Sequence, residues 1–223
     1  MFLIQVAGVH TVAEAQMLVE EGVTHVGFPL RLPVNAEDTT EAAARDIIAA
    51  IQPEVACVLI TYMDDCVEIL EFMDFLSVNI VQLHGDVSLA TLIELRRGRP
   101  SIEIIKSLVV REDNEAQLME DVQTLSPYVD WFITDTFDPS TGATGATGKT
   151  HDWSVSERLI HKSPKPIIMA GGLNHLNVNK AVAALQPAGI DAHTGLEDDA
   201  GIKDRQKVRE FVRSGLDALF DEN

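Results

Sequence analysis

The chain has 223 residues, of which 46% are hydrophobic and 23% charged, a composition typical of a globular protein with one sizeable core. No apolar run approaches the length of a membrane span, so we expect no membrane segment. The formal net charge of −18 argues against nucleic-acid binding, because little would offset repulsion by the phosphates. A small phosphorylated ligand held by local N–H groups stays compatible with that charge.

Apolar segments of strand character alternate with segments of helical period along the whole chain. The expected strands are 2–6, 24–28, 54–61, 79–83, 102–107, 130–134, 166–170 and 189–193. The expected helices are 11–21, 40–51, 64–76, 87–97, 112–125, 153–162, 175–185 and 203–219. Such a succession predicts an α/β fold, a single (β/α)8 TIM barrel over residues 1–223, with an open doubly wound sheet as the alternative.

Two helix starts and one long loop stand out. Thr11 precedes the first helical segment, and Asn174 precedes the seventh, where short polar side chains favour an N-cap. Residues 137–150 read FDPSTGATGATGKT, a loop without hydrophobic anchors between the sixth strand and its helix. Loops of this kind are lids or disordered segments, and we favour a lid over the site.

Glycine-containing turns follow the last two strands. Gly171 and Gly172 end one strand, and Thr194 and Gly195 end the next. At such β–α junctions backbone N–H groups can approach an anion where no Cβ blocks them. Two consecutive junctions therefore favour a phosphate site over two ordinary turns.

Titratable side chains also lie at the predicted strand ends, where barrel enzymes place their chemistry. Asp135 closes an apolar strand and could act as a general acid, the alternative being a loop or helix cap. Asp191 lies inside the eighth strand, as a functional or a structural carboxylate. His84 could contact a ligand or be a satisfied half-buried histidine. No metal-ligand spacing and no G-x-G-x-x-G fingerprint occur, so we expect neither a metal nor a cofactor.

The chain resembles phosphoribosylanthranilate isomerase, a barrel enzyme family of tryptophan biosynthesis, along almost its full length. The motifs that carry this resemblance occur in the family's order. They are VQLHGD at 81–86, IKS at 105–107, TDT at 134–136, GKTHDW at 148–153, MAGGLNHLNV at 169–178 and GIDAHTGLEDDAGIKD at 189–204.

The resemblance implies an Amadori rearrangement that converts a phosphorylated aminoaldose into an aminoketose, without a cofactor. By motif, Asp135 is the general acid on the ribose ring oxygen, and Asp191 is the aspartate of the eighth strand. The implied phosphate loops contain Gly145, Gly148, Gly171, Gly172, Thr194 and Gly195. The implied partner is a small phosphorylated sugar, and such barrels occur as monomers or homodimers.

The chain departs from the family pattern at two places. Ala7 occupies the position of the cysteine that serves as general base, and its methyl group cannot accept a proton. Arg31 is the only nearby arginine that could contact the anthranilate carboxylate. His10, His84 or a water could replace the base. The alternatives to an isomerase are an enzyme acting on another phosphorylated sugar and a non-catalytic phosphate-binding barrel.

The cysteine content indicates the compartment. Cys57 lies in an apolar run and Cys66 in a helical one, so a disulfide framework is not expected. This usage fits the reducing cytoplasm.

Overall fold

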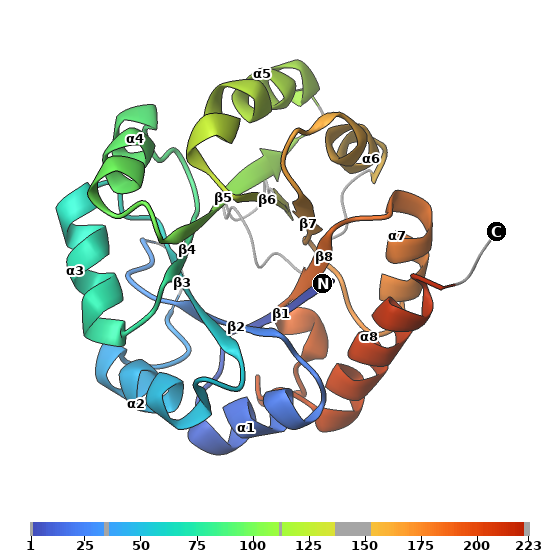
Figure 1. Ribbon diagram of the computed structural model, residues 1–223. Coiled ribbons are helices and arrows are strands. Elements are labelled where there is room, and N and C mark those ends of the chain that lie inside the picture. The colour runs from blue at the N-terminus through green and yellow to red at the C-terminus, as the bar shows by residue number, and fades with distance from the viewer. Residues whose placement is uncertain (1, 34–35, 112, 137–152, 221–223) are drawn as a thin grey trace.

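The computed structural model describes residues 2–33, 36–111, 113–136 and 153–220. In this part of the chain eight parallel strands close into a barrel in sequence order, and eight helices surround it (Figure 1). The predicted TIM barrel is therefore confirmed. The strands are β1 (Leu3–Ala7), β2 (His25–Pro29), β3 (Ala56–Thr61), β4 (Ile80–Leu83), β5 (Glu103–Val110), β6 (Trp131–Thr136), β7 (Ile167–Met169) and β8 (Gly189–Ala192). The helices are α1 (Val12–Glu20), α2 (Glu41–Ile51), α3 (Cys66–Leu76), α4 (Leu89–Gly98), α5 (Glu115–Leu125), α6 (Trp153–Lys162), α7 (Val178–Leu185) and α8 (Arg205–Asp217), with short 3₁₀ turns η1 (Ser126–Tyr128) and η2 (Thr194–Leu196).

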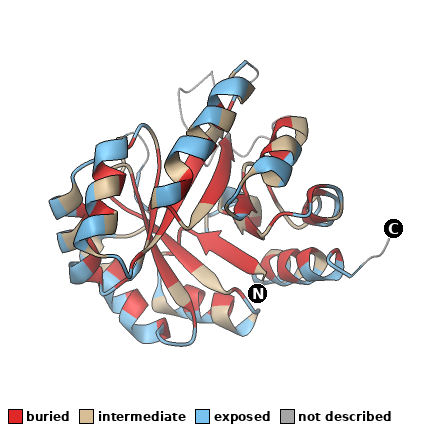
Figure 2. Cartoon of the chain, turned by 45° about the horizontal axis from the view of Figure 1, so that its top comes forward, coloured by how far each residue is buried: buried red, intermediate tan, exposed pale blue. Residues whose placement is uncertain are grey.

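Buried apolar side chains form two layers, one between the helices and the strands and one inside the barrel. Successive side chains of a strand point to opposite faces. In β1, Ile4 and Val6 therefore pack against the helices, while Leu3 and Ala7 belong to the inner layer. Figure 2 shows the result: the strands are buried, and most helices bury one face and expose the other. No helix among the described residues is long and apolar enough to cross a membrane.

The expected helix starts differ in their outcome. Thr11 is the N-cap of α1, and its hydroxyl accepts a hydrogen bond from the Glu14 N–H at 3.2 Å. Asn174 instead organises a turn, because its side-chain oxygen accepts from the Leu176 N–H at 2.8 Å. Helix α7 consequently begins at Val178, three residues later than the expected start.

Strands β5 and β6 extend beyond their expected ends. The pairs Val109–Asp135 and Val110–Thr136 continue the parallel register past the predicted last residues. The reason is that the apolar run of β5 continues through Val110 and supplies a partner for the end of β6. Asp135 is therefore a strand residue, and the parallel ladder fixes its backbone.

Closure of the barrel joins the two halves of the chain. Strand β1 pairs with β8 in a register that sets Gln5 opposite Asp191 and Val6 opposite Ala192. The next positions, Ala7 and His193, consequently lie side by side at the carboxyl ends of these strands. Positions far apart in the sequence thus share one edge of the barrel mouth.

Candidate active site

A cavity of about 390 Å³ opens at the carboxyl ends of the strands. It is lined from the barrel wall and from the loops that follow β7 and β8, the place where barrel enzymes keep their sites. The structure brings nine of the residues singled out in the sequence to this cavity. They are Ala7, His10, His84, Asp135, Gly171, Gly172, Asp191, Thr194 and Gly195.

Two residues of the predicted phosphate loops, Gly145 and Gly148, lie outside the described residues. The segment 137–150, expected to form a lid, lies outside them as well. Their assignment therefore rests on the resemblance.

A chain of polar side chains crosses the barrel beneath the cavity. The side-chain amide of Gln5 donates to Gln82 Oε1 at 2.7 Å and to Asp191 Oδ1 at 2.9 Å. Gln82 Nε2 lies 2.7 Å from His84 Nε2, and His84 Nδ1 lies 3.0 Å from Asp135 Oδ2. The two carboxyl groups singled out in the sequence are thus connected through three uncharged or weakly basic side chains.

The chain of contacts sets the tautomer of His84. The Gln82 amide nitrogen is a donor, so His84 Nε2 accepts from it and a neutral ring carries its proton on Nδ1. His84 Nδ1 lies within ion-pair distance of Asp135 Oδ2, but the two atoms do not have the geometry of a hydrogen bond, and both residues are buried. His84 is therefore an electrostatic neighbour of Asp135 inside the cavity wall.

Asp191 is the second carboxyl group at the cavity. Burial raises its pKa to about 6, although the hydrogen bond from Gln5 acts in the opposite direction. A carboxyl group with this pKa exchanges a proton near neutral pH. The group therefore has the property that proton transfer needs.

The glycine junctions have the geometry of an anion site. Gly171 and Gly172 have φ values of 92° and 70°, which residues with a Cβ rarely adopt. A Cβ on Gly195 would lie 2.2 Å from the Leu173 carbonyl oxygen, so the two loops are in direct contact there. Within the described part of the chain, the N–H groups of Gly171, Gly172, Thr194 and Gly195 have no hydrogen-bond partner. Free N–H groups at a cavity are available to phosphate oxygens.

Arg31 is directed away from this cavity. Its guanidinium forms an ion pair with Glu41 at 2.9 Å and lies over the Phe72 ring at 3.8 Å from the centroid. It does not line the cavity. The backbone of Arg31 has a φ of 55°, in the left-handed region that residues with a Cβ rarely adopt.

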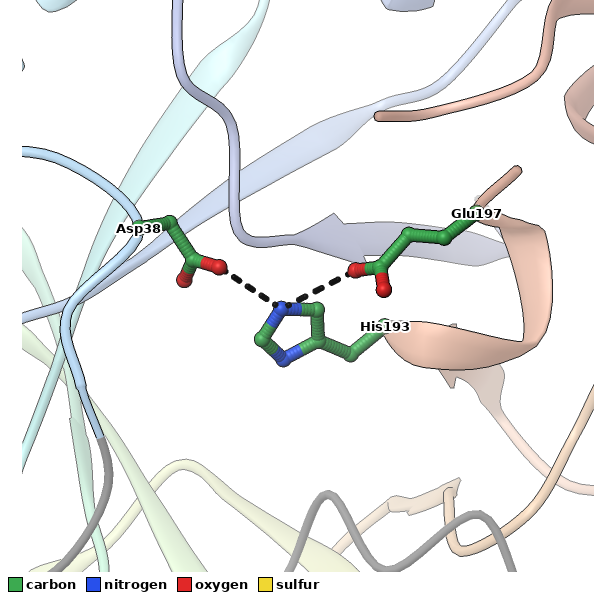
Figure 3. A group of neighbouring side chains, drawn as sticks. All are labelled: Asp38, His193 and Glu197. Carbon is green, nitrogen blue, oxygen red and sulfur yellow. Dashed lines mark hydrogen bonds and ion pairs between the residues drawn. The ribbon is translucent and has the colours of Figure 1, made fainter. Parts of the chain in front are cut away.

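Position 7 lies at the cavity, and the side chain there is only a methyl group. Ala7 belongs to the inner layer and lines the cavity beside Asp191 and His193. His193 also contacts two carboxylates, Asp38, which is 155 residues away in the sequence, and Glu197, which is four residues away. Figure 3 shows Asp38, His193 and Glu197 together, with His193 Nε2 3.3 Å from Asp38 Oδ1 and 3.4 Å from Glu197 Oε1. The donor types of this group would suit a cation, although Lys203 Nζ already lies 2.6 Å from Glu197 Oε1.

Lys106 of the IKS motif belongs to a second cavity, of about 620 Å³, beside β4, β5 and α5. Its ammonium group donates to the carbonyl oxygens of Gly85 at 2.8 Å and Ser107 at 2.9 Å. Burial lowers the pKa of Lys106 to about 8. The contacts tie the loop after β4 to β5 and so support the strand end that carries His84.

Comparisons with known proteins show which family the chain belongs to. The family model of N-(5'phosphoribosyl)anthranilate (PRA) isomerase matches residues 4–214. The chain is 34% identical over 218 residues to N-(5'-phosphoribosyl)anthranilate isomerase 2 of Methanosarcina mazei, covering 97% of this chain and 95% of the relative. It is 30% identical over 217 residues to the N-(5'-phosphoribosyl)anthranilate isomerase of Haloferax volcanii, covering 96% and 93%.

Solved structures give the same result. The phosphoribosyl anthranilate isomerase of Thermotoga maritima superposes with a TM-score of 0.82 at 26% identity, covering 97% of this chain and all of that one. Another, in complex with reduced 1-(o-carboxyphenylamino)-1-deoxyribulose 5-phosphate, has a TM-score of 0.79 at 23% identity with the same coverage and bears on the fold alone. The chain belongs to the PRA isomerase family.

Proposed function

We propose that this protein is an intramolecular isomerase that converts N-(5'-phosphoribosyl)anthranilate into the corresponding aminoketose, a step of tryptophan biosynthesis. The observation that carries the proposal is a cavity with a buried carboxyl group, Asp135, on its wall and unpaired backbone N–H groups on its rim. Membership of the PRA isomerase family identifies the substrate class.

The phosphate end of the site is assigned to the glycine junctions. Gly171, Gly172, Thr194 and Gly195 line the cavity from two loops in contact, and their N–H groups have no hydrogen-bond partner among the described residues. Backbone N–H donors can hold a phosphate without a positively charged side chain. A net charge of −18 is therefore compatible with a phosphate ligand. By resemblance, Gly145 and Gly148 of the preceding loop complete the phosphate site.

Asp135 is assigned as the general acid. Its proton passes to the ribose ring oxygen, the bond between that oxygen and C1 breaks, and the nitrogen lone pair forms a protonated imine at C1. His84 Nδ1–H, 3.0 Å away, stabilises the carboxylate that is left. The buried imidazole is in place beside the acid before substrate binds.

Asp191 is assigned a supporting role at the other end of the polar chain. Its carboxyl group is fixed by Gln5 and lines the cavity, with a pKa near 6. In that range it can release or accept a proton during the imine and enol stages at neutral pH. Arg31 receives no role, because its guanidinium is engaged with Glu41 outside the cavity.

The test is turnover of purified protein, followed by the loss of PRA fluorescence. Wild type is expected to turn over substrate, and Asp135→Asn to lose about 10²–10⁴ in kcat. Asp46→Asn, an exposed aspartate of α2, is the matched control and is expected to keep wild-type activity. Absence of turnover by wild type at high enzyme concentration would refute the proposal.

Ligand binding without turnover separates the remaining candidate, a phosphate-binding barrel that is not an enzyme. The observation in its favour is the methyl group of Ala7 at the cavity. Ribose 5-phosphate is expected to raise the melting temperature by mass action in either case. Stabilisation without turnover would favour the binding protein, and no stabilisation would contradict the phosphate assignment.

Two further assignments belong to this proposal. The partner is a small phosphorylated sugar and not a nucleic acid, which a surface of this charge would repel. The compartment is the cytoplasm, since Cys57 and Cys66 are free thiols in the structure.

A further inference from the structure

The proposed isomerisation needs a base for the C2 proton, and the family position for it holds a methyl group. Ala7 ends β1, and His193 directly follows β8, which pairs with β1 as far as Val6 and Ala192. Both residues line the same cavity. An imidazole therefore lies next to the position from which the cysteine is missing.

Gly8 makes room for this imidazole. A Cβ at Gly8 would lie 2.1 Å from His193 Nε2 and 2.8 Å from Asp38 Oδ2. The ring thus packs directly on the backbone at the end of β1, and a side chain at position 8 would displace it. The close approach fixes the ring plane before substrate arrives.

The carboxylates orient the ring. Asp38 Oδ1 and Glu197 Oε1 both face Nε2, so a neutral ring carries its proton on Nε2 (Figure 3). Burial alone would raise the pKa of Asp38, but its contact with His193 and the charges of Lys203 and His10 hold it below its ordinary value. Asp38 therefore remains ionised. Nδ1 has no hydrogen-bond partner among the residues that the structure describes and is left with its lone pair.

The charges around the group favour proton transfer over cation binding. Lys203 Nζ lies 2.6 Å from Glu197 Oε1 and neutralises that carboxylate. Asp191, on the same strand end, lies in the field of His193, which lowers its pKa. Of the two carboxylates that contact Nε2, Asp38 is then the one that Lys203 does not neutralise by direct contact. This is the arrangement of a histidine base held by a carboxylate.

The other described histidines at the cavity are less suited to remove the C2 proton. His84 uses Nε2 toward Gln82 and Nδ1 toward Asp135, the acid of the reaction. His10 Nε2 contacts the Gly201 carbonyl oxygen at 3.2 Å, and no carboxylate contact to its ring is found among the described residues. His193 alone combines the position beside Ala7 with a carboxylate on the opposite ring nitrogen.

We propose that His193 is the catalytic base that removes the C2 proton, with Asp38 as its positioning residue. The inference rests on the proposed isomerase function. Nδ1 takes the proton from C2, the C–H electron pair forms the C1–C2 double bond, and the C1–N double-bond pair returns to nitrogen. The resulting enol gains a proton at C1 from the imidazolium, and the C2 hydroxyl releases its proton to solvent, which returns one to Asp135. Atoms and charge balance over the cycle.

The first test compares histidine variants in the turnover assay. His193→Gln is expected to lower kcat by about 10²–10⁴ with KM changed by less than about threefold. His161→Gln, on the exposed face of α6, is the matched control. If wild type is inactive, the isomerase assignment itself fails. If wild type is active and Asp135→Asn is not, but His193→Gln keeps full kcat, only the base assignment is overturned. Loss of activity in His10→Gln alone would overturn it as well.

The second test introduces a cysteine at position 7, where the family has its base. Its readout is a gain of activity instead of a loss. Ala7→Cys in the His193→Gln background is expected to recover at least about tenfold in kcat, because a thiolate then lies at the same edge of the cavity. Failure to recover, with the double variant folded by circular dichroism, would count against the assignment. Loss of wild-type activity on chelation, with recovery on added Zn²⁺, would show a cation site instead.

A pH profile separates positioning from a structural role for Asp38. Asp38→Asn removes the negative charge beside the imidazolium, so the ascending limb of kcat is expected to move to lower pH while the plateau falls. The other charged groups that face His193, namely Glu197, Lys203, His10 and Asp191, are unchanged. A lower plateau with an unshifted limb would overturn the role of Asp38.

Discussion

Replacing Asp191 by Asn is expected to stabilise the protein at neutral pH and leave its stability almost unchanged in acid. Asp191 is enclosed by the barrel wall, and burial raises its pKa from the ordinary 3.8 to about 6. The Asn side chain has nearly the same shape, and its oxygen can still accept the hydrogen bond from Gln5. The substitution therefore removes the charge and little else.

The size of the effect follows from proton linkage. Between about pH 3.8 and pH 6 the folded protein binds the Asp191 proton more tightly than the unfolded chain does. The free energy of unfolding of wild type therefore decreases as pH rises through this window, and the full cost is present above it. At 1.36 kcal/mol per pH unit the shift corresponds to at most about 3 kcal/mol. Solvent in the cavity reduces this value, so about 2–3 kcal/mol is expected at pH 8.

The assay is urea unfolding of both proteins at pH values from 4 to 8, with melting temperatures as a second measure. The difference in unfolding free energy between Asp191→Asn and wild type should increase from near zero at pH 4 to a plateau above pH 7. Asp46→Asn on exposed α2 should show no such increase. A difference that is constant with pH, or a wild type more stable than the variant at pH 8, would refute the reasoning. A gain in stability together with a loss of turnover would indicate that the cost is retained for function.

Three more substitutions test separate parts of the site. Gly8→Ala, at φ 75° and with its Cβ 2.1 Å from His193 Nε2, is expected to cost at least about 1–2 kcal/mol in unfolding free energy and to lower kcat more than about tenfold. Gly195→Ala places a Cβ 2.2 Å from the Leu173 carbonyl oxygen, so the rise in melting temperature with ribose 5-phosphate should disappear while the barrel stays folded by circular dichroism. Arg31→Ala breaks an exposed ion pair and should cost no more than about 1 kcal/mol with KM within about twofold of wild type; a much higher KM would show that Arg31 leaves its ion pair to bind substrate.

Much of the fold follows from local patterning. Apolar runs and helical periods alternate strongly enough to predict every strand and helix of the barrel, because each element buries one face against the next layer. The errors are at the ends. Strand β5 continues to Val110 because β6 offers it a partner, and α7 starts late because Asn174 closes a turn first. Pairing between strands decides the first limit, and a local side-chain hydrogen bond decides the second.

The candidate site was predictable where it depends on strand ends. Barrel enzymes carry their reactive groups at the carboxyl ends of the strands. This rule singled out His84, Asp135 and Asp191, which the structure places at one cavity. The polar chain through Gln5 and Gln82 was not predictable. The sequence does not distinguish a strand glutamine that points into the barrel from one that does not. The contact of Asp38 with His193 was missed for a similar reason: barrel closure and the loop after β2 bring the two together from distant parts of the chain. Glu197 is only four residues from His193, but that spacing alone did not indicate a contact.

The most direct test of the assignment is a crystal structure of this protein with the reduced substrate analogue bound. Its phosphate is expected within about 3 Å of the N–H groups of Gly171, Gly172 and Gly195. The sugar carbons should then lie between Asp135 and His193, with Nδ1 about 3–3.5 Å from C2. A phosphate bound away from the glycine junctions, or a C2 atom out of reach of His193, would contradict the account.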